Sequence, residues 1–305
     1  MTDADAASGL TPDQLAVVDA CLDVLHNVPS ALITDIDGTI SAIAPTPFEA
    51  VVHAGALRAL EALTGHLHTV AVVSGRAPRD GAAMVGLPGL IYIGNHGMER
   101  IVQGSPWTHP AAEAARGPLA SALADIEAAV RAQDDAPWLL IENKGVTGTV
   151  HYRLAPDPDA AAALLEPIAI AAAERHGLRI SPGRMIIELR PALSVNKGTA
   201  IRDLVNDLGL HGAVFFGDDV TDVDGFLALR DLREAGVAAT ACVAVLGPET
   251  PEAVLAAADL SVTSVTACAL TLEAIATRLE AENAMAAAMA NENGNDHERG
   301  NETDR

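Results

Sequence analysis

The stretch that most constrains this chain is residues 31–40, where a short apolar run ends in Asp35 and Asp37 and is followed by a glycine turn. Side chains two positions apart on a strand project to the same side, so both acids should converge where a buried strand ends. Two like charges so placed repel each other, and a hard divalent cation with oxygen ligands is the natural counterion. Taken alone, the stretch predicts either a cation site at a strand end or a plain Asp-Gly turn.

Strand-like and helix-like segments alternate on both sides of the middle of the chain. A helical pattern at 54–65 separates the first strand from a second apolar run at 67–73, which ends in Ser74-Gly75-Arg76. Such strand–helix–strand units are right-handed crossovers between parallel strands, so the carboxyl ends of both strands lie on one rim of the sheet. The pattern predicts an α/β fold with a doubly wound, mostly parallel, Rossmann-like core.

The middle of the chain follows a different order of helix, two strands, helix and two strands, which is typical of a small α+β sandwich. We therefore expect an inserted α+β cap domain at 108–190 within a discontinuous core formed by 13–107 and 191–282. The small and acidic residues 1–12 are expected to be disordered, as is the tail at 283–305, which is polar and charged from 291 onward.

The charge balance of the chain bears on its partners. Its 305 residues carry 19 Lys and Arg against 41 Asp and Glu, a net charge of −22. Nucleic acids and anionic membranes need a basic face, so we expect no nucleic acid and no membrane as a partner. Without a leader pattern or a membrane span, the chain is expected to be cytoplasmic. Cys21, Cys242 and Cys268 lack paired spacing and should be reduced thiols.

Three further motifs follow the acid pair in order. They are Ser74 at the end of the second strand, Lys197 at a predicted helix start, and the run Gly-Asp-Asp-Val-Thr-Asp at 217–222. Together with the acid pair, these motifs resemble the four signatures of the haloacid dehalogenase (HAD) superfamily of phosphotransferases. Taken singly, Ser74 fits a helix-start turn, Lys197 a solvated lysine, and the last acids helix caps.

The resemblance implies a role for each of these residues. Asp35 would attack phosphorus to form an aspartyl-phosphate, and Asp37 would protonate the leaving sugar oxygen and later take a proton from water. Ser74 would donate a hydrogen bond to the phosphate, and Lys197 would supply positive charge. The implied cofactor is Mg²⁺, with ligands from Asp35, the Asp37 main-chain carbonyl and Asp218, supported by Asp219 and Asp222.

Segments outside these signatures are similar to the trehalose-6-phosphate phosphatases within that superfamily. The similar segments are the prolines after the acid pair, Gly-Asn-His-Gly-Met-Glu at 94–99, Glu-Asn-Lys-Gly at 142–145 with His-Tyr-Arg at 151–153, and Glu-Leu-Arg-Pro at 188–191 leading to Asn-Lys-Gly at 196–198. By this resemblance, Glu142, Lys144 and Glu188 would bind hydroxyls of the distal glucose. The full set expected to bind substrate is Thr39, Gly75, Arg76, His96, Glu142, Lys144, Glu188 and Asn196.

The expected protein is a Mg²⁺-dependent phosphoric monoester hydrolase of trehalose biosynthesis, converting trehalose 6-phosphate to trehalose and inorganic phosphate as a monomer or weak homo-oligomer. Its alternatives are a phosphatase for sucrose phosphate, a glycosyl-phosphoglycerate or a hexose phosphate, a hexose phosphomutase, and an inactive sugar-phosphate-binding regulator. Two local alternatives stay open as well. His96 is either a ligand contact or a structural histidine, and Glu142 and Lys144 form either a sugar site or a surface ion pair.

Overall fold

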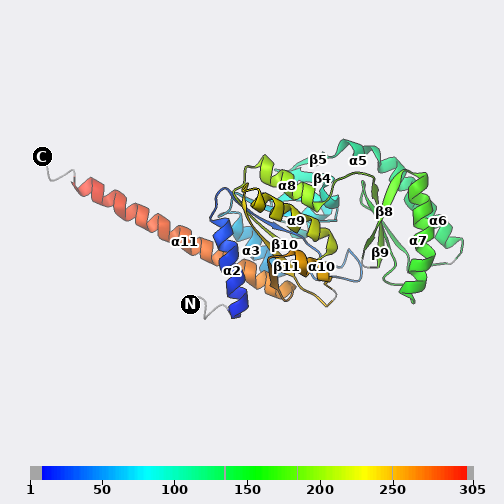
Figure 1. Cartoon of the computed structure of the whole chain (residues 1–305), viewed down its shortest axis with the longest axis horizontal. Coiled ribbons are helices and arrows are strands. Elements are labelled where there is room, and N and C mark those ends of the chain that lie inside the picture. The colour runs from blue at the N-terminus through cyan, green and yellow to red at the C-terminus, as the bar shows by residue number, and fades with distance from the viewer. Residues whose placement is uncertain (1–8, 134, 184, 249, 301–305) are drawn as a thin grey trace.

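The structure is a computed structural model that describes residues 9–300 except 134, 184 and 249, and omits the side chains of 182 and 290–300. The described chain contains an eight-stranded and a four-stranded sheet, each with helices packed against it (Figure 1). None of the described helices is both long enough and apolar enough to cross a membrane.

The larger sheet has the order β12-β11-β10-β1-β2-β3-β4-β5. The strands from β12 to β3 in this order pair in parallel, and β4 and β5 add an antiparallel edge. The chain leaves β1 in one direction through β2 and later returns to its other side at β10, which makes the β1–β10 boundary a topological switch point. The mostly parallel α/β core predicted from the sequence is confirmed. Its strands are β1 (Ser30–Thr34), β2 (Thr69–Val73), β3 (Ile91–Gly94), β4 (Glu99–Val102), β5 (Ser105–Thr108), β10 (Gly212–Gly217), β11 (Ala239–Val245) and β12 (Leu260–Val262).

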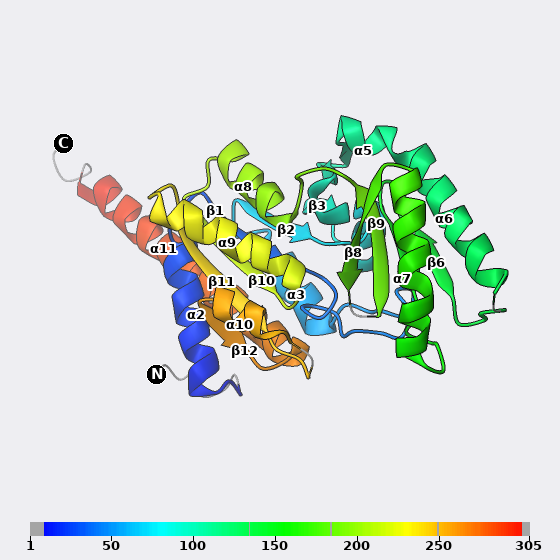
Figure 2. The same ribbon diagram turned by 45° about the vertical axis from the view of Figure 1, so that its right-hand side comes forward.

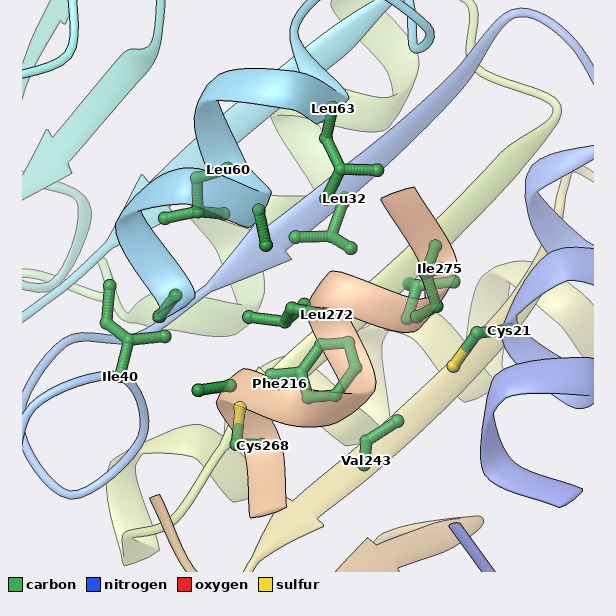
Figure 3. Packing of buried hydrophobic residues seen from close by; sticks show 14 of the residues in the cluster. Cys21, Leu32, Ile40, Leu60, Leu63, Phe216, Val243, Cys268, Leu272 and Ile275 are labelled. Atoms are coloured by element: carbon green, nitrogen blue, oxygen red, sulfur yellow. The ribbon is translucent and has the colours of Figure 1, made fainter. Parts of the chain in front are cut away.

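Helices cover both faces of this sheet, which explains why its central strands are apolar without alternation. Figure 3 shows the packing on one face, where Leu60 comes from α3 and Leu272 from α11. Both side chains lie near Leu32 of β1 and Phe216 of β10, which are fully buried. This face carries α2 (Pro12–Leu25), α3 (Ala54–Leu63), α4 (Pro78–Val85) and α11 (Val265–Gly300), and the other carries α8 (Lys197–Asp207), α9 (Val220–Glu234) and α10 (Glu252–Ala257).

The smaller sheet has the order β6-β7-β9-β8 and two chemically different faces. The apolar face, which includes Val150 and Leu189, packs against α6 and α7. Figures 1 and 2 place these helices on the side away from the larger sheet. The opposite face is polar because Glu142, Thr149 and Glu188 pair in register across β6, β7 and β9. The elements are α5 (Pro110–Ala114), α6 (Arg116–Arg131), β6 (Leu140–Asn143), β7 (Gly148–His151), α7 (Pro158–Arg175), β8 (Leu178–Gly183) and β9 (Ile186–Pro191).

Parts of both chain ends that were expected to be disordered are ordered in the described residues. Thr11 caps α2 through a capping box with Gln14, so order begins before residue 13. Helix α11 continues through 283–300, where disorder was expected, because the alanine-rich run at 284–290 has high helix propensity. Residues 1–8 and 301–305 lie outside the described residues.

Two smaller features also concern the sequence predictions. The first helix expected in the middle of the chain is instead two helices, α5 and α6, which meet at Ala115. Cys21, Cys242 and Cys268 are free and buried, as their spacing predicts.

Candidate active site

Three buried carboxylates meet where β1 and β10 end. Asp35 follows β1, Asp218 follows β10, and Asp222 lies in the first turn of α9. Ligand oxygens of the three lie within 4.8 Å of one another. They meet because β1 and β10 pair in parallel with Thr34 opposite Phe216, so both strands deliver their next residues to the same edge.

A single buried lysine is paired with this cluster. Lys197, the first residue of α8, is 2% exposed and donates a 2.6 Å hydrogen bond to Asp222 Oδ1. Its Nζ lies 3.0 Å from Asp35 Oδ1. Burial opposes its charge, but Asp222 and Asp35 outweigh that effect and raise the pKa of Lys197. Asp222 Oδ2 also accepts hydrogen bonds from the backbone N–H groups of Asp218 and Asp219, so this residue fixes both the lysine and the turn before α9.

The acid cluster holds more negative than positive charge. Burial, reinforced by Asp222 and Asp37 against the opposing Lys197, raises the pKa of Asp35 to about 7. Burial and repulsion from Asp35 and Asp222 likewise raise the pKa of Asp218 to about 8. Carboxylate oxygens are the ligands that hard divalent cations prefer, and a cation would offset this repulsion. The residues present therefore fit Mg²⁺.

The turn after β1 is shaped to approach the cluster closely. Gly38 has a φ of +89°, and a Cβ added there would lie 2.0 Å from Asp218 Oδ2. A side chain at Gly38 is therefore excluded on both conformational and steric grounds. Thr39, expected to bind substrate, donates a 3.1 Å hydrogen bond to Asp218 Oδ1 and so orients that carboxylate.

The Asp37 carboxylate is not part of the acid cluster. Arg76 binds it through two hydrogen bonds, 2.6 Å from Nε to Oδ2 and 2.7 Å from Nη2 to Oδ1. β1 ends at Thr34, before both acids, but Asp37 still helps to raise the pKa of Asp35, and the convergence of the two side chains around a cation stays a prediction. Arg76 also donates to Pro47 O at 2.9 Å, so it connects Asp37 to the loop after the acid pair.

Several other predicted site residues have local structural partners. Asn196 caps α8 by accepting from Thr199 N at 2.9 Å, and Asp219 caps α9 by accepting from Val220 N at 2.7 Å. The buried Ser74 follows β2 and accepts from Arg76 N through its Oγ at 3.3 Å. Helix capping therefore accounts for the contacts of Asn196 and Asp219.

Residues from the smaller sheet reach the core beside this cluster. Lys144 Nζ donates to Gly75 O at 3.3 Å and lies 3.8 Å from Glu188 Oε1. Glu188 in turn lies 3.1 Å from Nε2 of the core residue His96. Burial opposes the charge of Glu188, but His96 and Lys144 outweigh it and lower the pKa of Glu188 to about 2. The Glu142 carboxylate pairs with His151 at 3.0 Å.

Sequence reasoning missed the polar contacts beside His96. Asn95 and Thr147 are both fully buried, and Thr147 Oγ1 donates to Asn95 Oδ1 at 2.7 Å. Asn95 also donates to Glu99, which accepts from Arg116 of α6. The usable signal was Asn95 itself, because asparagine is enriched in the left-handed conformation that it adopts here with a φ of 49°.

The fold is shared with a solved structure of low sequence identity. A haloacid dehalogenase-like hydrolase from Bacteroides thetaiotaomicron shares the fold at a TM-score of 0.55 and 13% identity, covering 81% of this chain and 98% of that one. The chain belongs to the trehalose-phosphatase family, whose model matches residues 33–255.

Individual relatives carry two different names. A trehalose-phosphate phosphatase from Mycobacterium marinum is 36% identical over 208 residues, covering 65% of this chain and 51% of the relative. An uncharacterized glycosyl hydrolase from Mycobacterium tuberculosis is 36% identical over 236 residues, covering 74% of this chain and 17% of that protein. The chain thus spans about half the length of the trehalose-phosphate phosphatase it matches, and less of the glycosyl hydrolase.

Solved structures extend the comparison over more of the chain. A trehalose-6-phosphate phosphatase related protein has a TM-score of 0.67 at 26% identity, covering 81% of this chain and 97% of its own. The C-terminal domain of a Candida albicans trehalose-6-phosphate phosphatase has a TM-score of 0.69 at 22% identity, covering 87% and 97%, and shows the shared fold.

Proposed function

We propose that the protein is a Mg²⁺-dependent phosphatase that hydrolyses trehalose 6-phosphate to trehalose and inorganic phosphate. The observation that carries this proposal is the buried Asp35 beside Lys197, facing a polar sheet that brings Lys144 within 3.3 Å of Gly75 O. A phosphate held at the acid cluster therefore has polar side chains next to it for a hydroxyl-rich leaving group. We also propose that 13–107 with 191–282 forms the core unit and 108–190 the cap unit.

Asp35 is the proposed nucleophile. One of its oxygens attacks phosphorus, the bond from phosphorus to the sugar oxygen breaks, and Asp37 gives its proton to that oxygen. A water molecule then attacks the aspartyl-phosphate, Asp37 takes a proton from this water, and the bond from phosphorus to Asp35 breaks. Arg76 orients the Asp37 carboxylate for both transfers through its paired hydrogen bonds.

Charge is balanced by one lysine and one metal ion in this proposal. Lys197 neutralises part of the charge on Asp35 and on the phosphate, and Asp222 holds the lysine in place. Mg²⁺ would be held by Asp35, Asp218 and the Asp37 main-chain carbonyl, and it would neutralise phosphate oxygens when bound. Ser74, which follows the neighbouring strand β2, would donate a hydrogen bond to the phosphate.

The polar face of the smaller sheet is the proposed sugar site. Glu142 and Glu188 accept from sugar hydroxyls, and Lys144 donates to them. Sites for sugars need several such polar contacts because each buried hydroxyl must find a partner. Location in the cytoplasm and a monomeric or weakly oligomeric state remain predictions from the sequence.

Phosphate release from a panel of sugar phosphates tests the proposal. We expect trehalose 6-phosphate to be hydrolysed with the highest kcat/KM, above sucrose phosphate, a glycosyl-phosphoglycerate and glucose 6-phosphate. A higher kcat/KM for any of these three compounds would mean that it, and not trehalose 6-phosphate, is the preferred substrate. Phosphate retained on the sugar would indicate a phosphomutase, and no turnover with any compound would favour a sugar-phosphate-binding regulator.

A further inference from the structure

One core turn contacts both the phosphate side and the sugar side of the candidate site. Asn95 and His96 follow β3 in consecutive left-handed conformations, with φ values of 49° and 57°. Their backbone N–H groups donate to Arg76 O at 2.8 Å and to Ser74 O at 3.1 Å. A Cβ added at Gly75 would lie 2.8 Å from His96 Cε1, so the turn and the loop at 74–76 are closely packed.

The side chains of this turn point to the smaller sheet. Asn95 Oδ1 accepts from Thr147 Oγ1 at 2.7 Å, and its Nδ2 approaches Lys144 O at 3.4 Å. His96 Nε2 lies 3.1 Å from Glu188 Oε2. Two adjacent core residues therefore hold the segment that carries Lys144 and the strand that carries Glu188.

The orientation of the Asn95 amide is fixed by its other partner. Glu99 Oε2 accepts from Asn95 Nδ2 at 2.6 Å, and an ionised carboxylate cannot donate. The amide oxygen must therefore face Thr147. Glu99 is itself held by Arg116 at 2.7 Å and by Thr108 at 3.2 Å. Asn95 is fully buried, so its own hydrogen bonds to Glu99 and Thr147 are protected from water.

The segment at 144–147, whose Thr147 bonds to Asn95, also has an internal backbone hydrogen bond. Lys144 N donates to Thr147 O at 2.9 Å, which makes a tight turn between β6 and β7. With Thr147 fixed on the core, the position of Lys144 relative to Gly75 is fixed as well.

We propose that Asn95 is a positioning residue for substrate selection, which acts through Thr147 to set the distance between Lys144 and the loop at 74–76. The inference rests on the proposed function, because it assigns Lys144 to the sugar. Its consequence is that Asn95 affects discrimination between a disaccharide phosphate and a compact phosphate ester more than it affects phosphoryl transfer.

Asn95→Gly is the most informative variant. Glycine tolerates the left-handed backbone, so the substitution removes the amide without adding conformational strain. We expect the ratio of kcat/KM for trehalose 6-phosphate to that for para-nitrophenyl phosphate to fall about tenfold or more, since two buried hydrogen bonds are lost. Thr147→Val, which removes one of them, should lower the ratio about fivefold.

Thr240→Val is the matched control. Thr240 is also buried and donates its hydroxyl to Leu229 O at 3.1 Å, but it lies in β11 on another part of the core. This variant should lose about as much stability as Thr147→Val, since each loses one buried hydroxyl, and it should keep the ratio of the unmodified protein. A ratio of kcat/KM values that is unchanged in Asn95→Gly, whether both values stay constant or fall equally, would overturn the inference.

Hydrogen exchange separates this inference from the proposed function, because it needs no substrate. Asn95→Gly and Thr147→Val should accelerate amide exchange at 144–148 relative to Thr240→Val, and unchanged exchange there would overturn the positioning role. Failure of the unmodified protein to hydrolyse trehalose 6-phosphate would instead count against the proposed substrate, and the exchange result would still decide whether Asn95 positions Lys144.

Discussion

The acid cluster and the contacts between the two sheets are both buried and polar, yet their charges are balanced differently. At the cluster, three carboxylates share Lys197, and the pKa values of Asp35 and Asp218 rise to about 7 and about 8. At the sheet contacts, His96 and Lys144 lower the pKa of Glu188 to about 2. The acid cluster has an excess of negative charge that a bound cation can neutralise. At the sheet contacts, Glu188 is already paired with positively charged or donor groups of the protein, and these contacts fix the smaller sheet on the core.

The largest effect is expected for the proposed nucleophile. Asp35→Asn should lower phosphate release from trehalose 6-phosphate by at least about 10³-fold, because an amide cannot form the aspartyl-phosphate. Circular dichroism should show an unchanged fold, since the change also relieves repulsion among buried acids. Substantial residual turnover by the folded variant would exclude Asp35 as the nucleophile.

Removal of the Lys197 ammonium group should increase the excess of negative charge in the acid cluster. Lys197→Met leaves buried carboxylates without their cation and should lower the free energy of unfolding by about 3 kcal/mol. Urea denaturation in the absence and presence of Mg²⁺ measures this loss, and Mg²⁺ should restore part of it. A variant as stable as the unmodified protein without Mg²⁺ would show that the cluster does not need this charge.

The stability that the sheet contacts provide should fall at low pH, because Glu188 becomes protonated. The pKa of Glu188 is lowered from 4.5 to about 2, so its pairing stabilises the fold above pH 4.5 and is lost as the pH falls through about 2. Glu188→Gln should therefore make the decline in unfolding free energy between these pH values shallower, by about 2 kcal/mol. Identical pH dependence in both proteins would mean that Glu188 is not held as an ion in the fold.

A smaller effect is expected at the sugar side of the site. Lys144→Ala should lower kcat/KM for trehalose 6-phosphate about tenfold, because one charged hydrogen bond to the sugar is lost. Hydrolysis of para-nitrophenyl phosphate, measured in the same preparation, should fall much less. Equal losses on both substrates would place Lys144 in phosphoryl transfer or in folding instead of sugar recognition.

The sequence predicted the acid cluster better than the sheet contacts, and the reason is physical. Asp35 and Asp218 directly follow apolar strands, so the parallel sheet alone brings them to one edge. The contact between Asn95 and Thr147 joins residues 52 positions apart in turns that belong to different sheets, and its existence depends on how those sheets are placed. No local pattern encodes that placement.

Two differences arose where a local rule was extended too far. Period-two alternation was applied to Asp35 and Asp37, but β1 ends before both residues, and the rule does not reveal that Arg76 binds the Asp37 carboxylate. Polar composition suggested disorder at 283–300, but the alanines at the start of this range favour the continuation of α11.

The central claim is that the acid cluster binds a cation. Calorimetric titration with Mg²⁺ near pH 7 tests this claim most directly. Metal ligands must be deprotonated, and the pKa values of Asp35 and Asp218 lie at about 7 and about 8 without the ion. We predict saturable binding whose enthalpy depends on the buffer because protons are released, and loss of that binding in Asp218→Asn. Absence of binding to the unmodified protein, or equal binding to Asp218→Asn, would contradict the account.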